Sequence, residues 1–140
     1  MTGKSTAEKV VEKMMSGDWF SQWLGISILK VDPGSCVLKM KVRKEMLNGH
    51  GTAHGGISYS FADSALAFAS NGHGRKAVSI ETGISHIVAL KEGDVLIAEA
   101  EEVSIKNKIA IYNITVKKEE GELVALFKGT VYRTEKVWEV

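Results

Sequence analysis

The chain has 140 residues, of which 18 are lysine or arginine and 17 are aspartate or glutamate, so its formal charge at pH 7 is +1. Acidic and basic residues are interleaved along the sequence, which argues against a nucleic-acid partner. Apolar residues make up 44% of the chain, yet no apolar stretch approaches the ~20 residues needed to cross a bilayer. We therefore expect one folded domain over residues 1–140 and no membrane partner.

Cysteine content and the N-terminal sequence favour a cytoplasmic protein. Cys36 is the only cysteine, so no intrachain disulfide can form. Because a free cysteine usually behaves as a small buried hydrophobe, we expect Cys36 to lie in the core and give it no catalytic role. Residues 1–8 lack the apolar segment of a secretion signal.

An N-terminal helical arm is predicted over residues 1–24, ahead of a core over residues 25–135. Between residues 5 and 24 the apolar positions recur at helical spacing, and Gly17 with Asp18 marks a break between two helical pieces. Trp19 and Trp23 lie four positions apart on the apolar stripe. This spacing is more typical of packing inside the fold than of ligand binding.

Extended segments follow the arm. Apolar and polar residues alternate over 26–31 and 35–42, and the intervening Asp32-Pro33-Gly34 is typical of a turn, so these segments predict a hairpin. Four more extended segments are predicted later in the chain, at 77–89, 95–105, 109–117 and 123–132. Because their connections are short, we expect consecutive strands among these four to be antiparallel neighbours.

One segment between the strands differs from them. Residues 57–70 are rich in alanine and too long for a strand, and Asp63 is their only charged residue, which predicts a helix enclosed by other structure. Gly55-Gly56 suits the start of this helix, and Asn71-Gly72 suits a left-handed stop at its end. The predicted class is α+β, with an antiparallel sheet of about six strands packed against one long helix.

A chemical signal lies at the start of this helix. The loop 48–56 is rich in glycine, contains His50 and His54, and leads into a helix whose lone carboxylate is Asp63. Burying an unpaired carboxylate is costly. Asp63 is therefore either hydrogen-bonded or solvated at an interface, or it is retained for chemistry, and the composition of the helix leaves both readings open.

Thioester hydrolysis is the chemistry that these residue types suit. It needs a base or nucleophile beside the carbonyl carbon, and N–H donors for the oxygen that becomes negative. Asp63 can serve as base or as nucleophile, and residue identity does not separate the two routes. Gly55 and Gly56 can supply donors at the helix N-terminus, where unpaired N–H groups converge.

The spacing predicts a site shared between two chains. Asp63 follows Gly56 by two helical turns, roughly 10.5 Å along the axis, which is too far for both to meet one carbonyl group. Two antiparallel copies of the helix across a two-fold axis would place Asp63 of one chain opposite the Gly55-Gly56 end of the other. We therefore expect the chain to self-associate, at least as a homodimer.

Three polar residues are candidates with two readings each. Asn48 could orient the carboxylate or a water, and His54 could polarise the thioester oxygen, but each could equally hold the loop through hydrogen bonds. His86, on the third predicted strand, could line an acyl pocket or be an ordinary polar strand residue. The sequence alone does not decide among these readings.

The same residues carry a family resemblance. The run Met-Leu-Asn-Gly-His at 46–50, followed by His54-Gly55-Gly56 and Ala62-Asp63, resembles the signature of the hotdog-fold thioesterases of phenylacetic acid degradation. Further matches lie at 77–78, 93–94 and 124–129, so that the resemblance covers residues 24–133. It implies a hotdog fold, in which the sheet wraps around one long central helix.

The resemblance also implies an activity and an assembly. It implies hydrolysis of acyl-CoA thioesters, notably an aryl-CoA such as (hydroxy)phenylacetyl-CoA, to the free acid and CoA. The enzyme would be a homotetramer built from two hotdog dimers. Coenzyme A is then part of the substrate, and we expect no separate cofactor.

Individual residues receive roles from the resemblance. The position of Asp63 holds the base or nucleophile, and the position of Gly55 donates its N–H to the thioester carbonyl from the other subunit. Asn48 and His54 match assisting positions. Ser79 matches a position at which some relatives use a hydroxyl to hold the attacking water, so Ser79 joins Gly56 as a candidate for substrate binding.

Three rival interpretations use the same loop and helix. A metal site made from His50, His54 and Asp63 is disfavoured, because a four-residue histidine spacing aligns two rings only on a helix, and we expect no metal. A hotdog dehydratase or hydratase acting on thioesters could use His54 with Asp63. A non-catalytic acyl-CoA binding module would keep the pocket but would not need Asp63.

Overall fold

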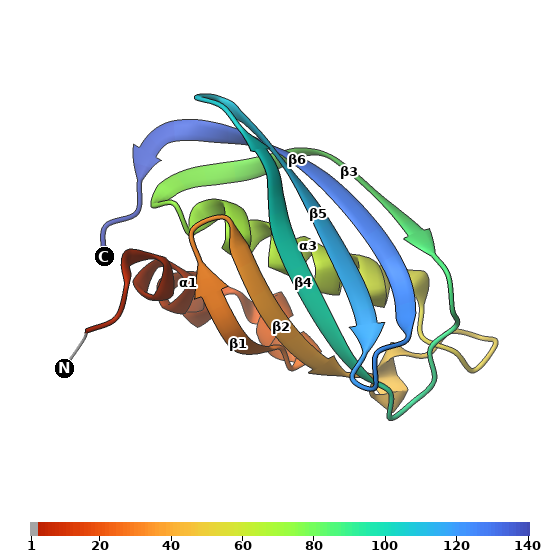
Figure 1. Ribbon diagram of the computed structural model, residues 1–140. Helices are drawn as coiled ribbons and strands as arrows, with labels where there is room; N and C mark the ends of the chain where they lie inside the picture. Colours follow the sequence, from red (N-terminus) through yellow and green to blue (C-terminus); the bar gives the residue numbers. More distant parts are fainter. Residues whose placement is uncertain (1–2) are drawn as a thin grey trace.

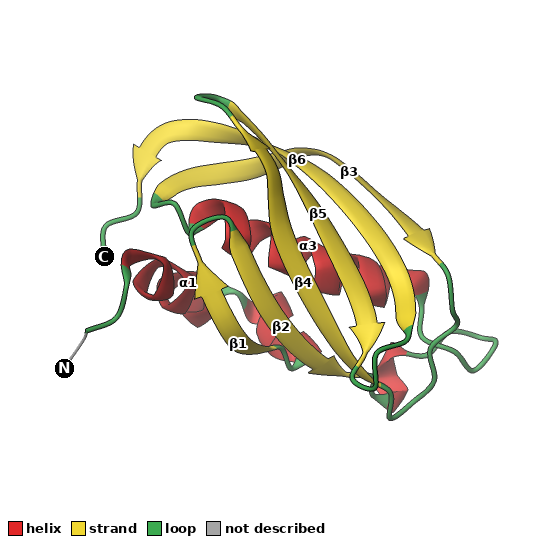
Figure 2. Cartoon of the chain, viewed as in Figure 1, coloured by secondary structure: helices red, strands yellow, loops and turns green. Residues whose placement is uncertain are grey.

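The computed structural model describes residues 3–140, which form a short helical arm, a six-stranded sheet and one long helix (Figures 1 and 2). Helix α1 (Thr6–Gly17) begins after Ser5, whose side chain accepts the N–H of Glu8 while Glu8 bonds back to the N–H of Ser5. Asp18 ends α1 and caps α2 (Trp19–Leu24). The predicted two-piece arm is confirmed, although residues 1–2 of it lie outside the described residues.

The sheet is antiparallel throughout, with the strand order β1-β2-β4-β5-β6-β3. Its strands are β1 (Ser27–Asp32), β2 (Ser35–Lys41), β3 (Arg75–His86), β4 (Val95–Ile105), β5 (Ile109–Lys118) and β6 (Leu123–Val137). The predicted hairpin of β1 and β2 is confirmed, with Gly34 at φ 84° in its turn. A one-turn helix, η1 (Lys44–Met46), which the sequence does not predict, follows β2.

The prediction that β3 and β4 are neighbours is wrong. Strand β3 pairs with β6 at the edge of the sheet, whereas β4 pairs with β2 and β5. The segment 87–94 joins β3 to β4 across three strand spacings, roughly 14 Å, and an extended segment of that length reaches up to about 26 Å. A short connection therefore permits neighbouring strands without requiring them.

Helix α3 (Gly55–Asn71) lies within the curve of the sheet (Figure 1) and packs with the strands to form the core. Phe61, Leu66 and Phe68 are buried, and a fully buried side chain of this size contributes about 1.5–3 kcal/mol. Gly129 on β6 allows the helix to approach closely, because a Cβ there would overlap Cδ2 of Leu66. Cys36 is 2% exposed in the same core, as predicted.

Both ends of α3 differ from the prediction. The helix begins at Gly55, two residues early, and His54 is its N-cap. The predicted left-handed stop at Gly72 is wrong, since its φ is −60°, and Gly74 carries the left-handed conformation instead, with φ 100°. Asn71 bonds the Ala67 carbonyl in the last turn through its own side chain, so a glycine cap is not needed there.

One side of α3 is not covered by the sheet. Ser60, Asp63 and Ala67 are only partly buried, whereas the residues between them are buried. Positions three and four residues apart lie on one face of a helix. These residues therefore form a single stripe, and the exposed Gly56 extends it to the N-terminus of the helix.

The expectation that the tryptophans of α2 pack inside this fold is wrong. Trp19 is 74% exposed, and Phe20 and Trp23 are exposed as well. The rings of Phe20 and Trp23 stack with their centroids 6.1 Å apart, and the Arg43 guanidinium lies 4.8 Å from the Trp23 ring. Ser21, which is buried, turns the opposite side of α2 toward α3, so that the aromatic side chains face outward.

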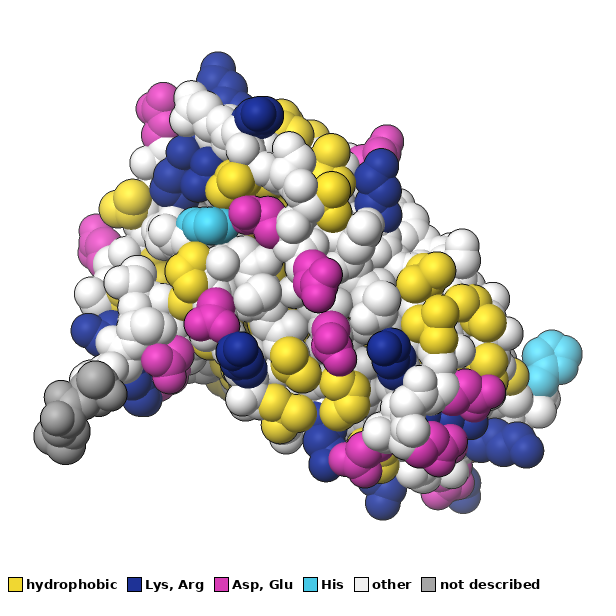
Figure 3. All heavy atoms as spheres, viewed as in Figure 1, with side chains coloured by type: hydrophobic (Ala, Val, Ile, Leu, Met, Phe, Trp, Pro, Cys, Tyr) yellow, Lys and Arg dark blue, Asp and Glu magenta, His cyan; other side chains and the backbone are white. Residues whose placement is uncertain are grey.

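Charged side chains are mixed over the surface. Figure 3 shows basic and acidic groups interspersed over one face of the molecule, without a block of a single sign. Among residues 3–140, no helix is both long and apolar enough to span a membrane.

Candidate active site

The loop before α3 is held by Asn48. Its Oδ1 accepts the backbone N–H of His50 at 2.9 Å, the N–H of Thr52 at 3.2 Å and the hydroxyl of Thr52 at 3.3 Å. The loop then joins the segment after β3, where the Ala53 N–H donates to the Leu90 carbonyl at 2.7 Å. In the single chain Asn48 therefore fixes the loop that leads to the helix N-terminus.

His54 separates the two glycines at the start of α3. Its Nδ1 accepts the N–H of Gly56 at 3.1 Å, which leaves the ring proton of neutral His54 on Nε2. The N–H of Gly55, by contrast, meets no acceptor within residues 3–140. Gly55 rather than Gly56 thus presents an unpaired donor at the positive end of the α3 dipole.

His86 lies against Gly55. A Cβ added to Gly55 would stand 3.3 Å from Nε2 of His86. The other ring nitrogen, Nδ1, is 3.2 Å from the Ser58 hydroxyl, and that hydroxyl is 3.3 Å from the carbonyl of Gly55. Gly55, Ser58 and His86 line a cavity of about 230 Å³ together with residues 52–53 and 87–90.

Asp63 lies on the uncovered stripe of α3 without a counter-charge. Burial raises the pKa of its carboxyl above the ordinary value, and the nearby Asp18 carboxylate raises it further. Neither a hydrogen bond nor an ion pair holds the Asp63 carboxylate within residues 3–140. The sequence leaves open whether Asp63 is hydrogen-bonded or solvated at an interface, or is retained for chemistry. In the described part of the single chain the carboxylate has no internal hydrogen-bond partner.

Asp18 reaches this region through a short chain of hydrogen bonds. Its Oδ2 accepts the Ser21 hydroxyl at 2.6 Å, and Ser21 Oγ lies 2.8 Å from Ser64 Oγ on α3, next to Asp63 in the chain. The arm is thereby fixed against the helix beside the unpaired carboxylate. The sequence marks Asp18 only as a break between helices, because its contact with α3 is between residues distant in the chain.

Ser79 lies on β3, at the edge of the sheet. It stands opposite Val131, which is buried, and directly opposed residues project to the same face of a sheet, here the face that carries α3. The side chain of Ser79 is exposed in the single chain. Thr82, also on β3, differs from Ser79 because its hydroxyl is hydrogen-bonded to the Tyr59 hydroxyl.

The predicted site residues are not all gathered within one chain. His54 and Gly55 lie at the N-terminus of α3 and Asn48 in the loop before it, while Asp63 lies two turns further along the helix. Within residues 3–140, no three His, Cys, Asp or Glu side chains are grouped as metal ligands would be. That the protein binds no metal stays a prediction.

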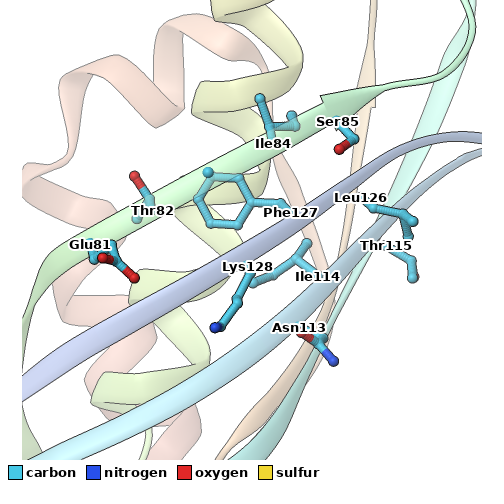
Figure 4. Close-up of a pocket in the computed structure, with 11 residues that line it drawn as sticks. Glu81, Thr82, Ile84, Ser85, Asn113, Ile114, Thr115, Leu126, Phe127 and Lys128 are labelled. Atoms are coloured by element: carbon cyan, nitrogen blue, oxygen red, sulfur yellow. The ribbon is translucent and has the colours of Figure 1, made fainter.

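A larger hollow of the surface lies elsewhere. It has a volume of about 780 Å³ and is formed by β3, β5 and β6, with Glu81, Asn113 and Lys128 among its lining residues (Figure 4). None of the predicted site residues lines it. The unpaired donor and the unpaired carboxylate, rather than the size of a cavity, locate the candidate active site.

Comparison with known proteins identifies the family. Residues 50–125, which include Gly55, Asp63 and His86, match the thioesterase superfamily. The chain belongs to this superfamily. A putative esterase of Archaeoglobus fulgidus is 44% identical over 90% of this thioesterase and 82% of the relative. The acyl-coenzyme A thioesterase PaaI of Escherichia coli is 36% identical over 86% of each chain.

Solved structures establish the fold of this thioesterase. The structure of the E. coli PaaI protein from the phenylacetic acid degradation operon superposes with a TM-score of 0.92 and 33% identity, covering 94% of this chain and 96% of that one. A hypothetical thioesterase from Streptococcus pneumoniae, solved with coenzyme A, has a TM-score of 0.78 and 26% identity over 81% of this chain and 88% of that one. The hotdog fold predicted from the resemblance is confirmed.

Proposed function

We propose that this thioesterase hydrolyses acyl-CoA thioesters to the free acid and CoA, with an aryl-CoA such as (hydroxy)phenylacetyl-CoA as its preferred substrate class. One observation carries the proposal. An unpaired N–H, that of Gly55, and an unpaired carboxylate, that of Asp63, lie along one uncovered side of α3. The first suits the oxygen of a thioester carbonyl, and the second suits attack at its carbon.

A homodimer would complete the site. The two turns between Gly56 and Asp63 correspond to roughly 10.5 Å, so one chain cannot present both groups to one carbonyl. Two copies of α3 packed antiparallel through the partly buried stripe would bring Asp63 of each chain to the Gly55 end of the other. Pairing of two such dimers into a homotetramer stays a prediction, as does a cytoplasmic location.

Asp63 would act in its ionised form. In one route its carboxylate takes a proton from water, the water oxygen bonds to the carbonyl carbon, and the C–S bond breaks to release CoA as a thiolate that then gains a proton. In the other route a carboxylate oxygen attacks the carbon directly, CoA leaves, and water hydrolyses the resulting anhydride. The raised pKa of Asp63 makes its carboxylate a stronger base in either route.

The remaining predicted residues would assist. The Gly55 N–H would bind the carbonyl oxygen, and the His54 and Gly56 pair would hold the turn that aims it. Asn48 would keep the loop in place through its Oδ1, while its amide N–H groups could reach the carboxylate or the water of the partner chain. Ser79 would hold the attacking water from the edge strand.

The substrate class rests on the relatives. The E. coli relative is named an acyl-CoA thioesterase and comes from a phenylacetic acid degradation operon, and the S. pneumoniae structure contains coenzyme A. Coenzyme A would bind as part of the substrate, so no separate cofactor is needed.

The test measures the hydrolysis of hydroxyphenylacetyl-, benzoyl- and hexanoyl-CoA through the thiol that is released. We expect turnover of an aryl-CoA by the wild type, and a loss of about 100-fold or more in kcat for Asp63→Ala and Asp63→Asn. The matched control is Glu101→Gln, which removes an exposed carboxylate from β4 and should leave kcat unchanged. Binding of these esters without thiol release would instead favour a binding module or a dehydratase.

A further inference from the structure

The contact between His86 and Gly55 is not explained by packing. His86 is the last residue of β3, and its side chain is exposed in the single chain, so it fills no part of the core. Its Nε2 nevertheless lies close to Gly55. A Cβ built on Gly55 would stand only 3.3 Å from this nitrogen. The ring therefore borders the cavity that the unpaired N–H of Gly55 also borders.

Ser58 holds the ring in this place. It is 4% exposed and lies on the first turn of α3. Its single hydroxyl proton has two acceptors in reach, the Gly55 carbonyl at 3.3 Å and Nδ1 of His86 at 3.2 Å. A buried hydroxyl that joins a helix terminus to an exposed ring fixes the orientation of that ring.

The hydrogen-bonding pattern allows Nε2 to be a donor. If Ser58 donates to Nδ1, the neutral ring carries its proton on Nε2. If the ring is an imidazolium, Nδ1–H donates to Ser58, Ser58 donates to the Gly55 carbonyl, and Nε2 again carries a proton. A developing negative charge in the cavity favours these two states over the neutral tautomer with a bare Nε2, because only a donor stabilises it.

We propose that His86 is a further catalytic residue of this thioesterase, whose Nε2–H donates to the thioester carbonyl oxygen beside the N–H of Gly55, and that Ser58 is its positioning residue. The inference rests on the proposed function, since it needs a thioester at Gly55. Two donors from different elements, a helix terminus and the end of an edge strand, would then converge on one oxygen. The cavity of about 230 Å³ accommodates the reacting group and not a whole acyl-CoA.

The proposal also accounts for glycine at position 55. A side chain there would press its Cβ against the His86 ring, which would separate the two donors. The neighbouring His86 ring therefore favours glycine at this position, whereas backbone conformation does not require it, since Gly55 does not adopt a positive φ.

Substitutions of His86 separate the two ring nitrogens. In His86→Gln the side-chain amide nitrogen reaches the place of Nε2, whereas in His86→Asn it reaches only the place of Nδ1 and can still contact Ser58. We expect His86→Asn and His86→Phe to lower kcat about 10- to 100-fold with KM changed less than about threefold, because a donor to the oxyanion acts mainly in the transition state. His86→Gln should recover most of the lost kcat.

Ser58→Ala should have a smaller effect, about three- to tenfold in kcat, because the ring remains but is less well oriented. Thermal unfolding and light scattering on each variant would check folding and assembly. A ring that serves only as a wall of the cavity would show a raised KM with unchanged kcat, and would make His86→Phe the best substitute rather than His86→Gln. Either of those results overturns the proposal.

The wild-type measurement keeps the two claims apart. A wild type that releases no thiol from any ester contradicts the proposed function and the role of His86 together. A wild type that turns over, with Asp63→Asn inactive and His86→Asn at wild-type kcat, contradicts the role of His86 alone. Loss of kcat in His86→Asn with recovery in His86→Gln supports both.

Discussion

The two ends of α3 differ in how their polar groups are used. At the C-terminal end, Asn71 bonds the carbonyls of Ala67 and Ala77, the N–H of Ala77 and the indole N–H of Trp138. At the N-terminal end, the Gly55 N–H has no acceptor within residues 3–140. One end of the helix is closed by internal hydrogen bonds, and the other keeps a donor available for a ligand.

A second set of polar side chains near the C-terminal end of α3 is also hydrogen-bonded within the chain. Glu102 on β4 accepts the Tyr112 hydroxyl at 2.9 Å and lies 2.6 Å from Nε2 of His73. Burial and the Glu102 hydrogen bond raise the pKa of the Tyr112 hydroxyl, so it remains a donor. Each of these polar groups has a partner inside the chain, as is usual for buried groups that serve stability.

This difference separates the end of α3 that is suited to chemistry from the end that is suited to stability. Both ends contain a histidine near a helix terminus, and residue type alone would rank them equally. Only the N-terminal end combines an unpaired N–H with an open cavity. Substitutions at the two ends should therefore have opposite signatures, affecting activity at one end and stability at the other.

Of the two helix ends, the N-terminal end should show the larger effect, at Gly55. Gly55→Ala places a Cβ against the His86 ring and should lower kcat about 100-fold, the usual loss for one disturbed oxyanion donor. The stability should be unchanged or slightly higher, because alanine favours the helix. Steady-state kinetics with thermal unfolding would measure both, and a variant with wild-type kcat would contradict the assignment of Gly55.

The opposite signature is expected at Asn71. Asn71→Ala removes four hydrogen bonds at a buried position and should lower the free energy of unfolding by about 2–4 kcal/mol. The kcat per folded molecule should stay near that of the wild type. Asn113→Ala, at an exposed asparagine on β5, is the control and should change stability by less than about 0.5 kcal/mol. Denaturant unfolding would compare the two.

The packing of α3 on the sheet gives a third prediction. In Gly129→Ala the new Cβ would overlap the buried Leu66 side chain, and we expect a loss of about 1–3 kcal/mol in the free energy of unfolding. Gly83→Ala on β3 meets nothing within 4 Å and serves as the control. Equal effects of the two substitutions would show that the helix does not pack against β6 as described.

Asp63 should lower stability while it serves activity. Its folded-state pKa is raised, mainly by burial. Between the ordinary pKa of the unfolded state and this raised pKa, the folded state therefore binds more protons than the unfolded state. Stability falls as pH rises through this interval. Asp63→Asn should therefore be more stable than the wild type near pH 7, by about 1 kcal/mol, and the difference should vanish in acid. Unfolding curves of both proteins at several pH values would test this.

Activity should depend on pH in the opposite direction. Because the carboxylate is the reactive form, kcat/KM should fall as pH decreases through the raised pKa of Asp63, above the ordinary range of an aspartate. A rate that stays constant into the range of an unperturbed aspartate would contradict the burial of this carboxylate in the working enzyme.

Local patterns predict much of the fold. The alternation over 95–105 matches β4, and the alanine-rich segment with its single Asp63 identifies α3 to within two residues. The edge position of β3 could not be predicted in this way, because strand pairing depends on contacts between distant residues. The exposure of Trp19 likewise depends on which side of α2 meets α3.

The residues of the candidate site also differ in whether the local sequence could predict them. Asn48, His54, Gly55 and Asp63 stand out because they lie close together in the sequence in an unusual composition. His86 does not, because its link to Ser58 joins a strand to a helix across 28 positions. The roles of these residues, and that of Ser79, stay predictions until they are tested by substitution.

The central claim is that each site uses Asp63 of one chain and Gly55 of its partner, and complementation tests it most directly. Asp63→Ala and Gly55→Ala chains would be co-expressed in equal amounts and purified as assembled oligomers. Random pairing gives mixed dimers half of the time, each with one intact site, so about a quarter of wild-type activity should return. Activity that stays at the level of the two parent variants, with mixed dimers demonstrated, would contradict a shared site.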